Sequence, residues 1–167
     1  MKPVLKTIHL VILISLLTSG RPLNKDTYKE PVINKDSLIN FSKRQLGKNY
    51  SYANCTPKTG FDYSGFVYYV FNHFKVEVPR SSSEYNSFGT MVSEDSCKTG
   101  DIIVFTGTDA SKRWPGHVGI ILTGKPMISF IHSSSDKRKP GVKISNFKDT
   151  PNYQKRFIKM VRVCKVL

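Results

Sequence analysis

Hydrophobic residues recur every three or four positions in two stretches of the first half of the chain, the spacing of a helix with one apolar face. The first stretch predicts a helix over about 36–46, with Asp36 placed to cap its start and Gly47 placed to end it. The second begins at Asp62 and reads YSGFVYYVFNHF, so we expect a largely buried helix. The apolar residues of the two predicted helices are Leu38, Ile39, Phe41 and Leu46 in the first, and Phe66, Val67, Val70, Phe71 and Phe74 in the second.

After Gly100 the pattern changes to five short, mostly apolar runs, which are typical of strands separated by turns. Between the second helix and these runs, the serines of 81–83 with Glu84 predict a short capped helix that ends near Gly89. Helices first and consecutive strands second predict an α+β domain, with N-terminal helices packed on an antiparallel sheet of five to six strands. The predicted strands are 101–106, 117–122, 127–132, 142–147 and 157–166.

The first twenty residues have a different pattern. Lys2 and Lys6 precede an apolar run over 8–17, and small residues follow, which is the order of a secretory signal peptide. The run is about half of the roughly 20 residues that a membrane-spanning helix needs, so we expect no stable membrane span once the signal is removed. A buried helix is the alternative. The predicted organisation is a signal peptide at 1–20, a linker at 21–34 and a single domain at 35–167.

The chain is strongly basic, with a formal net charge of +14. Residues 1–20 hold two lysines and no acidic residue, so the charge of the exported form would be +12. Such a domain should adhere to anionic cell-wall polymers, acidic lipids or nucleic acid. Export to the periplasm, the cell wall or the extracellular medium disfavours nucleic acid. A well-solvated basic surface with no specific ligand remains an alternative.

The three cysteines, Cys55, Cys97 and Cys164, are compatible with one disulfide and one free thiol, or with three free thiols. None of them has C-x-x-C spacing or a histidine at ligand spacing. We therefore expect no metal site and no cofactor.

The start of the second helix is a place where chemistry is favoured. A helix N-terminus lowers the pKa of a thiol and stabilises a developing oxyanion. His117 opens one predicted strand and His132 closes the next, so an antiparallel pair joined by a short turn brings both to the same end of the sheet. One could then act as a base and the other could orient it. The alternative is two unrelated surface histidines.

Several motifs then resemble one family. The segments LGKNYSY, GFDYSGFVYYVF, VPRSS, KTGDIIVF, GHVGIIL and FIHSS follow one another at spacings similar to those of NlpC-type cell-wall cysteine peptidases. The resemblance covers nearly all of 37–165. It implies a papain-like α+β domain whose helix-borne nucleophile packs against a sheet that carries the base. It also implies hydrolysis of peptidoglycan stem peptides, commonly between D-glutamate and a diamino acid, by a Cys-His-His site.

Matched residue by residue, the resemblance assigns His117 as the general base and His132 as the residue that orients it. Asp62 and Ser64 match side chains that hold the amino end of the stem peptide in some members, and Tyr50 matches a tyrosine that lines the cleft. Arg80 matches a frequent arginine whose role is as readily structural as functional. The paired glycines common in the loop before the helix are replaced by Asn54-Cys55.

The main departure is Tyr63, because the family motif D-C-S-G reads D-Y-S-G here. A phenol with a pKa of about 10 is harder to ionise than a thiol of about 8.5. Its oxygen also lies farther from the backbone, and attack requires reacting atoms roughly 3–3.5 Å apart. We therefore expect Tyr63 to occupy the cleft without acting as a nucleophile.

Three interpretations remain open on the sequence. The first is an exported, catalytically impaired protein that binds stem peptides or the cell wall. The second is an active cell-wall hydrolase that uses another nucleophile, Cys55 or Ser64. The third is a basic adhesive protein for anionic surfaces.

Overall fold

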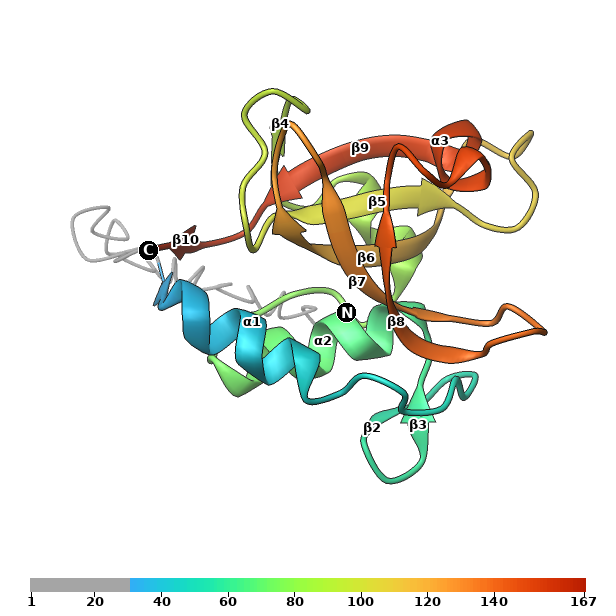
Figure 1. The fold of residues 1–167 in the computed structure, drawn as a ribbon, viewed down its shortest axis with the longest axis horizontal. Coiled ribbons are helices and arrows are strands. Elements are labelled where there is room, and N and C mark those ends of the chain that lie inside the picture. The colour runs from blue at the N-terminus through green and yellow to red at the C-terminus, as the bar shows by residue number, and fades with distance from the viewer. Residues whose placement is uncertain (1–30) are drawn as a thin grey trace, which may run out of the picture.

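A computed structural model describes residues 31–167, so the predicted signal peptide and most of the predicted linker lie outside the described residues. The chain folds into a six-stranded antiparallel sheet with two helices against one face (Figure 1). The strand order is β4-β9-β5-β6-β7-β8. The α+β class and the sheet of five to six antiparallel strands are therefore confirmed.

Each of the five predicted strands is present. They are β5 (Ile102–Thr106), β6 (Pro115–Thr123), β7 (Ser129–Ser134), β8 (Gly141–Asn146) and β9 (Phe157–Arg162). The last prediction, 157–166, was too long. The sheet strand ends at Arg162, and β10 (Lys165–Val166) leaves the sheet to pair in parallel with β1 (Val32–Ile33). Because β1 is part of the fold and Ile33 is buried, the domain begins before the end of the predicted linker.

The first helix, α1, spans Lys35–Lys43 and ends three residues before its predicted end. Asn34, not Asp36, caps it, since the side-chain oxygen of Asn34 accepts a hydrogen bond from the backbone of Ser37 at 2.9 Å. Leu38 and Phe41 are buried as expected. Leu46 was wrongly placed on the apolar face, because it follows the helix in a turn and is 43% exposed.

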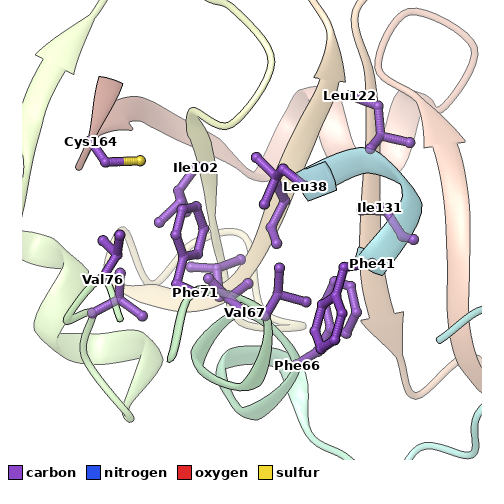
Figure 2. Close-up of a cluster of buried hydrophobic side chains, with 14 of the residues drawn as sticks. Leu38, Phe41, Phe66, Val67, Phe71, Val76, Ile102, Leu122, Ile131 and Cys164 are labelled. Carbon is purple, nitrogen blue, oxygen red and sulfur yellow. The ribbon is translucent and has the colours of Figure 1, made fainter. Parts of the chain in front are cut away.

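The second helix, α2, spans Tyr63–His73 and packs against β6 and β7 with α1 beside it. Its Phe66, Val67 and Phe71 are fully buried and meet side chains from α1 and from β5 and β7 (Figure 2). Burying each such ring stabilises the fold by roughly 1.5–3 kcal/mol. This contact fixes the start of α2 against the sheet.

Strand β5 lies inside the sheet and is buried on both faces, which explains why its sequence is a continuous apolar run. Alternate residues point to opposite faces. Ile102 and Val104 join the core under α2, whereas Ile103 and Phe105 join a second cluster on the other face. Tyr153, from α3 (Pro151–Arg156), closes that second cluster.

Several short elements were not predicted. They are the hairpin of β2 (Cys55–Thr56) and β3 (Gly60–Phe61), strand β4 (Thr90–Val92), and α3. The short helix expected at 81–89 is a 3₁₀ helix, Ser82–Asn86. The loop that holds Asn54-Cys55 places its positive φ, 58°, at the preceding Ala53.

Candidate active site

Asp62 sets the start of α2. Its Oδ1 accepts a hydrogen bond from the backbone N–H of Gly65 at 2.6 Å, as an N-cap residue does. The guanidinium of Arg80 donates to both carboxylate oxygens of Asp62, at 3.0 and 2.8 Å. The carboxylate that the resemblance matches to amine recognition is thus already paired with a cation. Its observed contacts are structural.

Gly65 allows the preceding loop to approach the helix. A Cβ atom at this position would lie 2.2 Å from the carbonyl oxygen of Asn54. That same carbonyl accepts a hydrogen bond from the backbone of Asp62 at 2.9 Å. The glycine of the D-Y-S-G motif therefore lets the loop lock the helix start in place.

The two histidines lie side by side, as the antiparallel pairing of β6 and β7 predicted. His117 Nε2 lies 3.1 Å from His132 Nδ1, and His132 Nε2 lies 3.0 Å from the hydroxyl of Ser145 on β8. One ring nitrogen of His117 is thereby held. The other, Nδ1, is buried and has no hydrogen-bond partner within the described part of the chain. It is the nitrogen left for a proton transfer.

Aromatic rings enclose the histidine pair. Tyr153 stacks on His117 with ring centroids 5.5 Å apart and meets His132 edge-on at 5.2 Å. Burial is the main cause that lowers the pKa of His117 well below its usual range, and the positive charges of Arg156 and Lys143 add to it. Burial likewise lowers the pKa of His132 to about 3. Both imidazoles are therefore neutral at pH 7.

Tyr63, the first residue of α2, extends across the cleft to the loop between β7 and β8. Its hydroxyl lies 2.5 Å from the hydroxyl of Ser135. Its ring lies against His117, with centroids 4.5 Å apart and planes at 70°. The phenol oxygen is thus hydrogen-bonded on the far wall of the cleft.

Tyr63 lines two cavities. The first, which we call the Tyr50 cavity, has a volume of about 570 Å³. The second, which we call the basic cavity, has a volume of about 500 Å³ and includes His117 in its wall. The Tyr50 cavity is lined by Tyr50, Tyr52, Ala53, Asp62–Ser64, Arg80–Ser83, Pro115 and Gly116. The basic cavity is lined by Tyr63, Thr108, His117, Ser134–Arg138, Lys143, Ser145, Thr150, Asn152, Tyr153 and Arg156.

The remaining candidate residues lie on the Tyr50 side. The rings of Tyr50 and Tyr63 are 5.2 Å apart. Burial, together with the neighbouring phenol of Tyr63, raises the pKa of Tyr50 above its usual range. The hydroxyl of Ser64 lies 3.4 Å from Arg80, whose pKa is raised mainly by Asp62 and to a lesser extent by Cys55. The two alternative nucleophiles are thus grouped around Arg80, whereas His117 is in the wall of the other cavity.

Three residues at the site were missed on the sequence. Ser145 belonged to a predicted strand, and its alternation with Lys143 toward one face could have indicated it. Ser135 lies beyond the end of β7 and Tyr153 lies in the unpredicted α3, so no periodic pattern pointed to either.

No three His, Cys, Asp or Glu side chains gather as a metal ion would require among residues 31–167. The helices of the same residues include none long and apolar enough to cross a membrane.

The amino-acid sequence is similar to those of known proteins of one family. A model of the NlpC/P60 family matches residues 47–162. The chain is 31% identical over 150 residues to the murein DD-endopeptidase/LD-carboxypeptidase MepS of Escherichia coli, covering 87% of this chain and 73% of that protein. It is 29% identical over 162 residues to the gamma-DL-glutamyl hydrolase of Bacillus subtilis, covering 97% of this chain but only 36% of that protein.

Solved structures show the same fold. An NlpC/P60 family protein from Bacillus cereus superposes with a TM-score of 0.69 at 29% identity, covering 81% of this chain and 42% of that one. RipD from Mycobacterium tuberculosis, described as a non-catalytic NlpC/p60 domain protein adapted to peptidoglycan binding, gives a TM-score of 0.59 at 21% identity. That match covers 77% of this chain and 96% of RipD.

Proposed function

The chain belongs to the NlpC/P60 family, and on that basis we propose that it is an exported protein that binds the peptide stems of peptidoglycan in its cleft without hydrolysing them. The observation that carries the proposal is the position of Tyr63. A phenol, hydrogen-bonded to Ser135, stands where the family motif has its nucleophilic cysteine.

Hydrolysis by Tyr63 is disfavoured on three grounds. Its phenol loses a proton far less readily than a thiol. His117, whose ring lies against that of Tyr63, has a pKa lowered mainly by burial and is a weak proton acceptor while the tyrosine covers it. The phenol oxygen is hydrogen-bonded to Ser135 and lies farther from the backbone of α2 than the sulfur of a cysteine would, so it is not at the distance from which a cysteine would attack.

Binding is supported by what remains of the cleft. Two cavities of about 570 and 500 Å³ flank Tyr63, and both fall in the size range of ligand pockets. The relatives from E. coli and B. subtilis are named for hydrolysis of murein and of gamma-glutamyl bonds. RipD offers a precedent on the same fold for peptidoglycan binding without catalysis. We therefore assign the cleft to wall peptides that contain a γ-glutamyl bond.

Export is proposed from the sequence pattern of residues 1–20 and from the cell-wall role of these relatives. The net charge of +12 for the exported form would bring it to anionic wall polymers. Adhesion through charge alone is the second candidate, and the net charge is the observation that favours it.

The test combines sedimentation with purified peptidoglycan and detection of new amino termini. We expect the chain to sediment with peptidoglycan and to release no amino termini. Ser82→Trp, which fills the Tyr50 cavity, should weaken binding, whereas the matched Ser87→Trp outside the cavity should not. Release of amino termini that disappears in His117→Ala would contradict the proposal. Binding that is lost at about 0.5 M salt and is unaffected by Ser82→Trp would assign the chain to charge-driven adhesion.

A further inference from the structure

The end of the sheet farthest from the histidine pair has hollows of its own. Strand β6 carries His117 at the cleft and ends at Thr123, six residues or roughly 20 Å away. Three hollows, with volumes of about 660, 330 and 300 Å³, lie around the turn between β6 and β7 and around β10, and Thr99 lines all three. None of the residues that line them lines the Tyr50 cavity or the basic cavity. They belong to a surface that is separate from the cleft.

Three exposed lysines from distant parts of the chain gather at this surface. Lys35 begins α1, Lys98 precedes β5, and Lys165 lies in β10. Lys35 and Lys98 line one hollow, and Lys98 and Lys165 line the next. The backbone N–H of Lys35 donates to the carbonyl of Leu167 at 2.6 Å, and that of Lys165 donates to the carbonyl of Pro31 at 3.0 Å. The fold, not a run of basic residues in the sequence, brings the three charges together.

The charges of these three lysines are not offset by acidic partners. Within residues 31–167, none of the three forms an ion pair. Among the described residues that line the hollows, Asp101 is the only acidic one, and it pairs with Arg162 at 2.8 Å. The neighbouring Lys125 is also compensated, because it pairs with the exposed Asp95. The surface therefore has an excess of positive charge, which attracts anions.

Two exposed apolar side chains accompany the lysines. Met127, in the turn between β6 and β7, is 71% exposed and lines the largest hollow together with Lys35. Val32, which is 52% exposed, lies opposite Lys165 in the pair of β1 and β10. Apolar side chains gain free energy when they leave water for the boundary between lipid head groups and acyl chains, whereas a soluble polyanion would use the lysines alone. The combination therefore favours a surface of anionic lipid over an anionic polymer.

We propose that this surface, which we call the lipid-facing surface and define by Val32, Lys35, Lys98, Met127 and Lys165, binds membranes that contain anionic lipid. The inference goes beyond the proposed function and does not depend on what the cleft binds. With β10 toward the bilayer, the hairpin of β2 and β3 and the loop between β7 and β8 would point away from it (Figure 1). The cleft would then stay open to material outside the membrane.

The test measures cosedimentation with lipid vesicles. The protein is the proposed exported form, residues 21–167, because it contains every described residue and lacks the apolar run at 8–17, which could bind lipid by itself. At about 0.1 M salt, where the Debye length is about 10 Å, we expect it to bind vesicles of equal parts phosphatidylglycerol and phosphatidylcholine. Binding to vesicles of phosphatidylcholine alone should be at least about tenfold weaker, because each lysine near an anionic bilayer raises the partition coefficient roughly fivefold.

Two triple variants with the same net charge separate this surface from charge in general. Lys35→Gln, Lys98→Gln and Lys165→Gln, combined in one chain, should lower the partition coefficient on the anionic vesicles by about a hundredfold. The control combines substitutions of three exposed lysines near the cleft end of the molecule, and it should leave the partition coefficient nearly unchanged because these charges would be screened from the bilayer. The control substitutions are Lys48→Gln, Lys58→Gln and Lys112→Gln.

Tryptophan emission tests the orientation of the bound domain. Trp114, the only tryptophan in the sequence, lies in the loop between β5 and β6 at the cleft end. Its emission should not change when the protein binds vesicles. Met127→Trp, made together with Trp114→Phe, places the probe on the lipid-facing surface, and its emission should move to shorter wavelength as the ring enters lipid.

Equal partition coefficients of the two triple variants would overturn the lipid-facing surface, because net charge alone would then explain binding. A shift in the emission of Trp114 without a shift at Met127→Trp would also overturn it, because the cleft end would then face the lipid. Binding to soluble polyphosphate but to neither kind of vesicle would assign the lysines to an anionic polymer instead. Vesicle binding as expected, with no sedimentation on peptidoglycan, would overturn the proposed function and leave this surface standing.

Discussion

Replacing Tyr63 by cysteine is the sharpest test of the cleft, because it restores the thiol that the family motif contains. The change removes a half-buried ring and its hydrogen bond to Ser135, at a cost of about 1–2 kcal/mol in the free energy of unfolding. Typical domains have 5–15 kcal/mol of stability, so the variant should stay folded. It also removes a ring from the wall of both cavities.

The introduced thiol would lie at the N-terminus of α2 and beside His117. Removal of the Tyr63 ring would open His117 to the cleft and relieve the burial that keeps its imidazole neutral. Thiols beside a helix N-terminus and a protonated histidine have pKa values of about 3.5–7.5, below the ordinary 8.5 or so. The pH dependence of alkylation by iodoacetamide, followed by mass spectrometry of the peptide that contains position 63, measures this pKa. Cys55 in the same chain serves as a reference thiol. We expect Tyr63→Cys to titrate below about pH 7.5, and the added His117→Ala to move it back toward 8.5.

The same variant should release new amino termini from peptidoglycan, and His117→Ala should abolish that release. General-base catalysis typically contributes 10²–10⁴-fold, so the loss should be at least about a hundredfold. A thiol that titrates near 8.5 whether or not His117 is present would refute the view that the machinery around Tyr63 is otherwise complete. A lowered pKa of the thiol without cleavage of peptidoglycan would show that the peptide is no longer positioned for attack.

Three further predictions concern stability. Gly65→Ala should lower the free energy of unfolding, measured by urea denaturation, by about 1–3 kcal/mol, because the Cβ of alanine would lie 2.2 Å from the Asn54 carbonyl oxygen. Alanine favours helices more than glycine does, so a stabilised variant would contradict this close contact. Asp62→Ala should cost about 1 kcal/mol more than Asp62→Asn, since asparagine keeps a cap for Gly65; equal losses would show that the ion pair with Arg80 matters more than the cap. Burial lowers the pKa of His132 to about 3, so below about pH 6.5 the unfolded chain binds more protons than the folded chain. The contribution of neutral His132 to the free energy of unfolding is therefore fully present above about pH 6.5. It should fall on acidification by about 1.4 kcal/mol per pH unit. Urea denaturation between pH 7 and pH 5 should show this slope and His132→Gln should reduce it, whereas an unchanged slope would place its origin elsewhere.

The sequence predicted the elements whose hydrophobic pattern is long enough to be read. The buried α2 and the five sheet strands follow from such runs, and the pairing of β6 with β7 was enough to bring His117 and His132 together. The sequence pattern failed to predict burial where the surroundings of a side chain depend on the path of the backbone and on distant parts of the chain. Leu46 continues the helical spacing of apolar residues, but the helix ends at Lys43 and leaves Leu46 exposed.

The polar parts of the site were predicted less completely for the same reason. Asp62 was expected at the cleft, but its carboxylate binds Arg80 from a segment after the helix, which no local pattern reveals. Tyr63 was expected to occupy part of the cleft, whereas its hydrogen-bond partner Ser135 was not foreseen. That hydrogen bond joins residues far apart in sequence, and only the folded sheet brings them together.

The parallel pair of β1 and β10 lies on the side of the molecule away from the loop between β7 and β8 (Figure 1). It joins Val32–Ile33, before the first helix, to Lys165–Val166, after the last strand of the sheet. In a polypeptide that crosses a membrane as an extended thread, the first of these strands emerges before the six-stranded sheet and the second emerges after it. The β1–β10 pair can therefore form only after all six strands of the sheet have crossed, which would delay final folding of the domain until it has reached the compartment where it works.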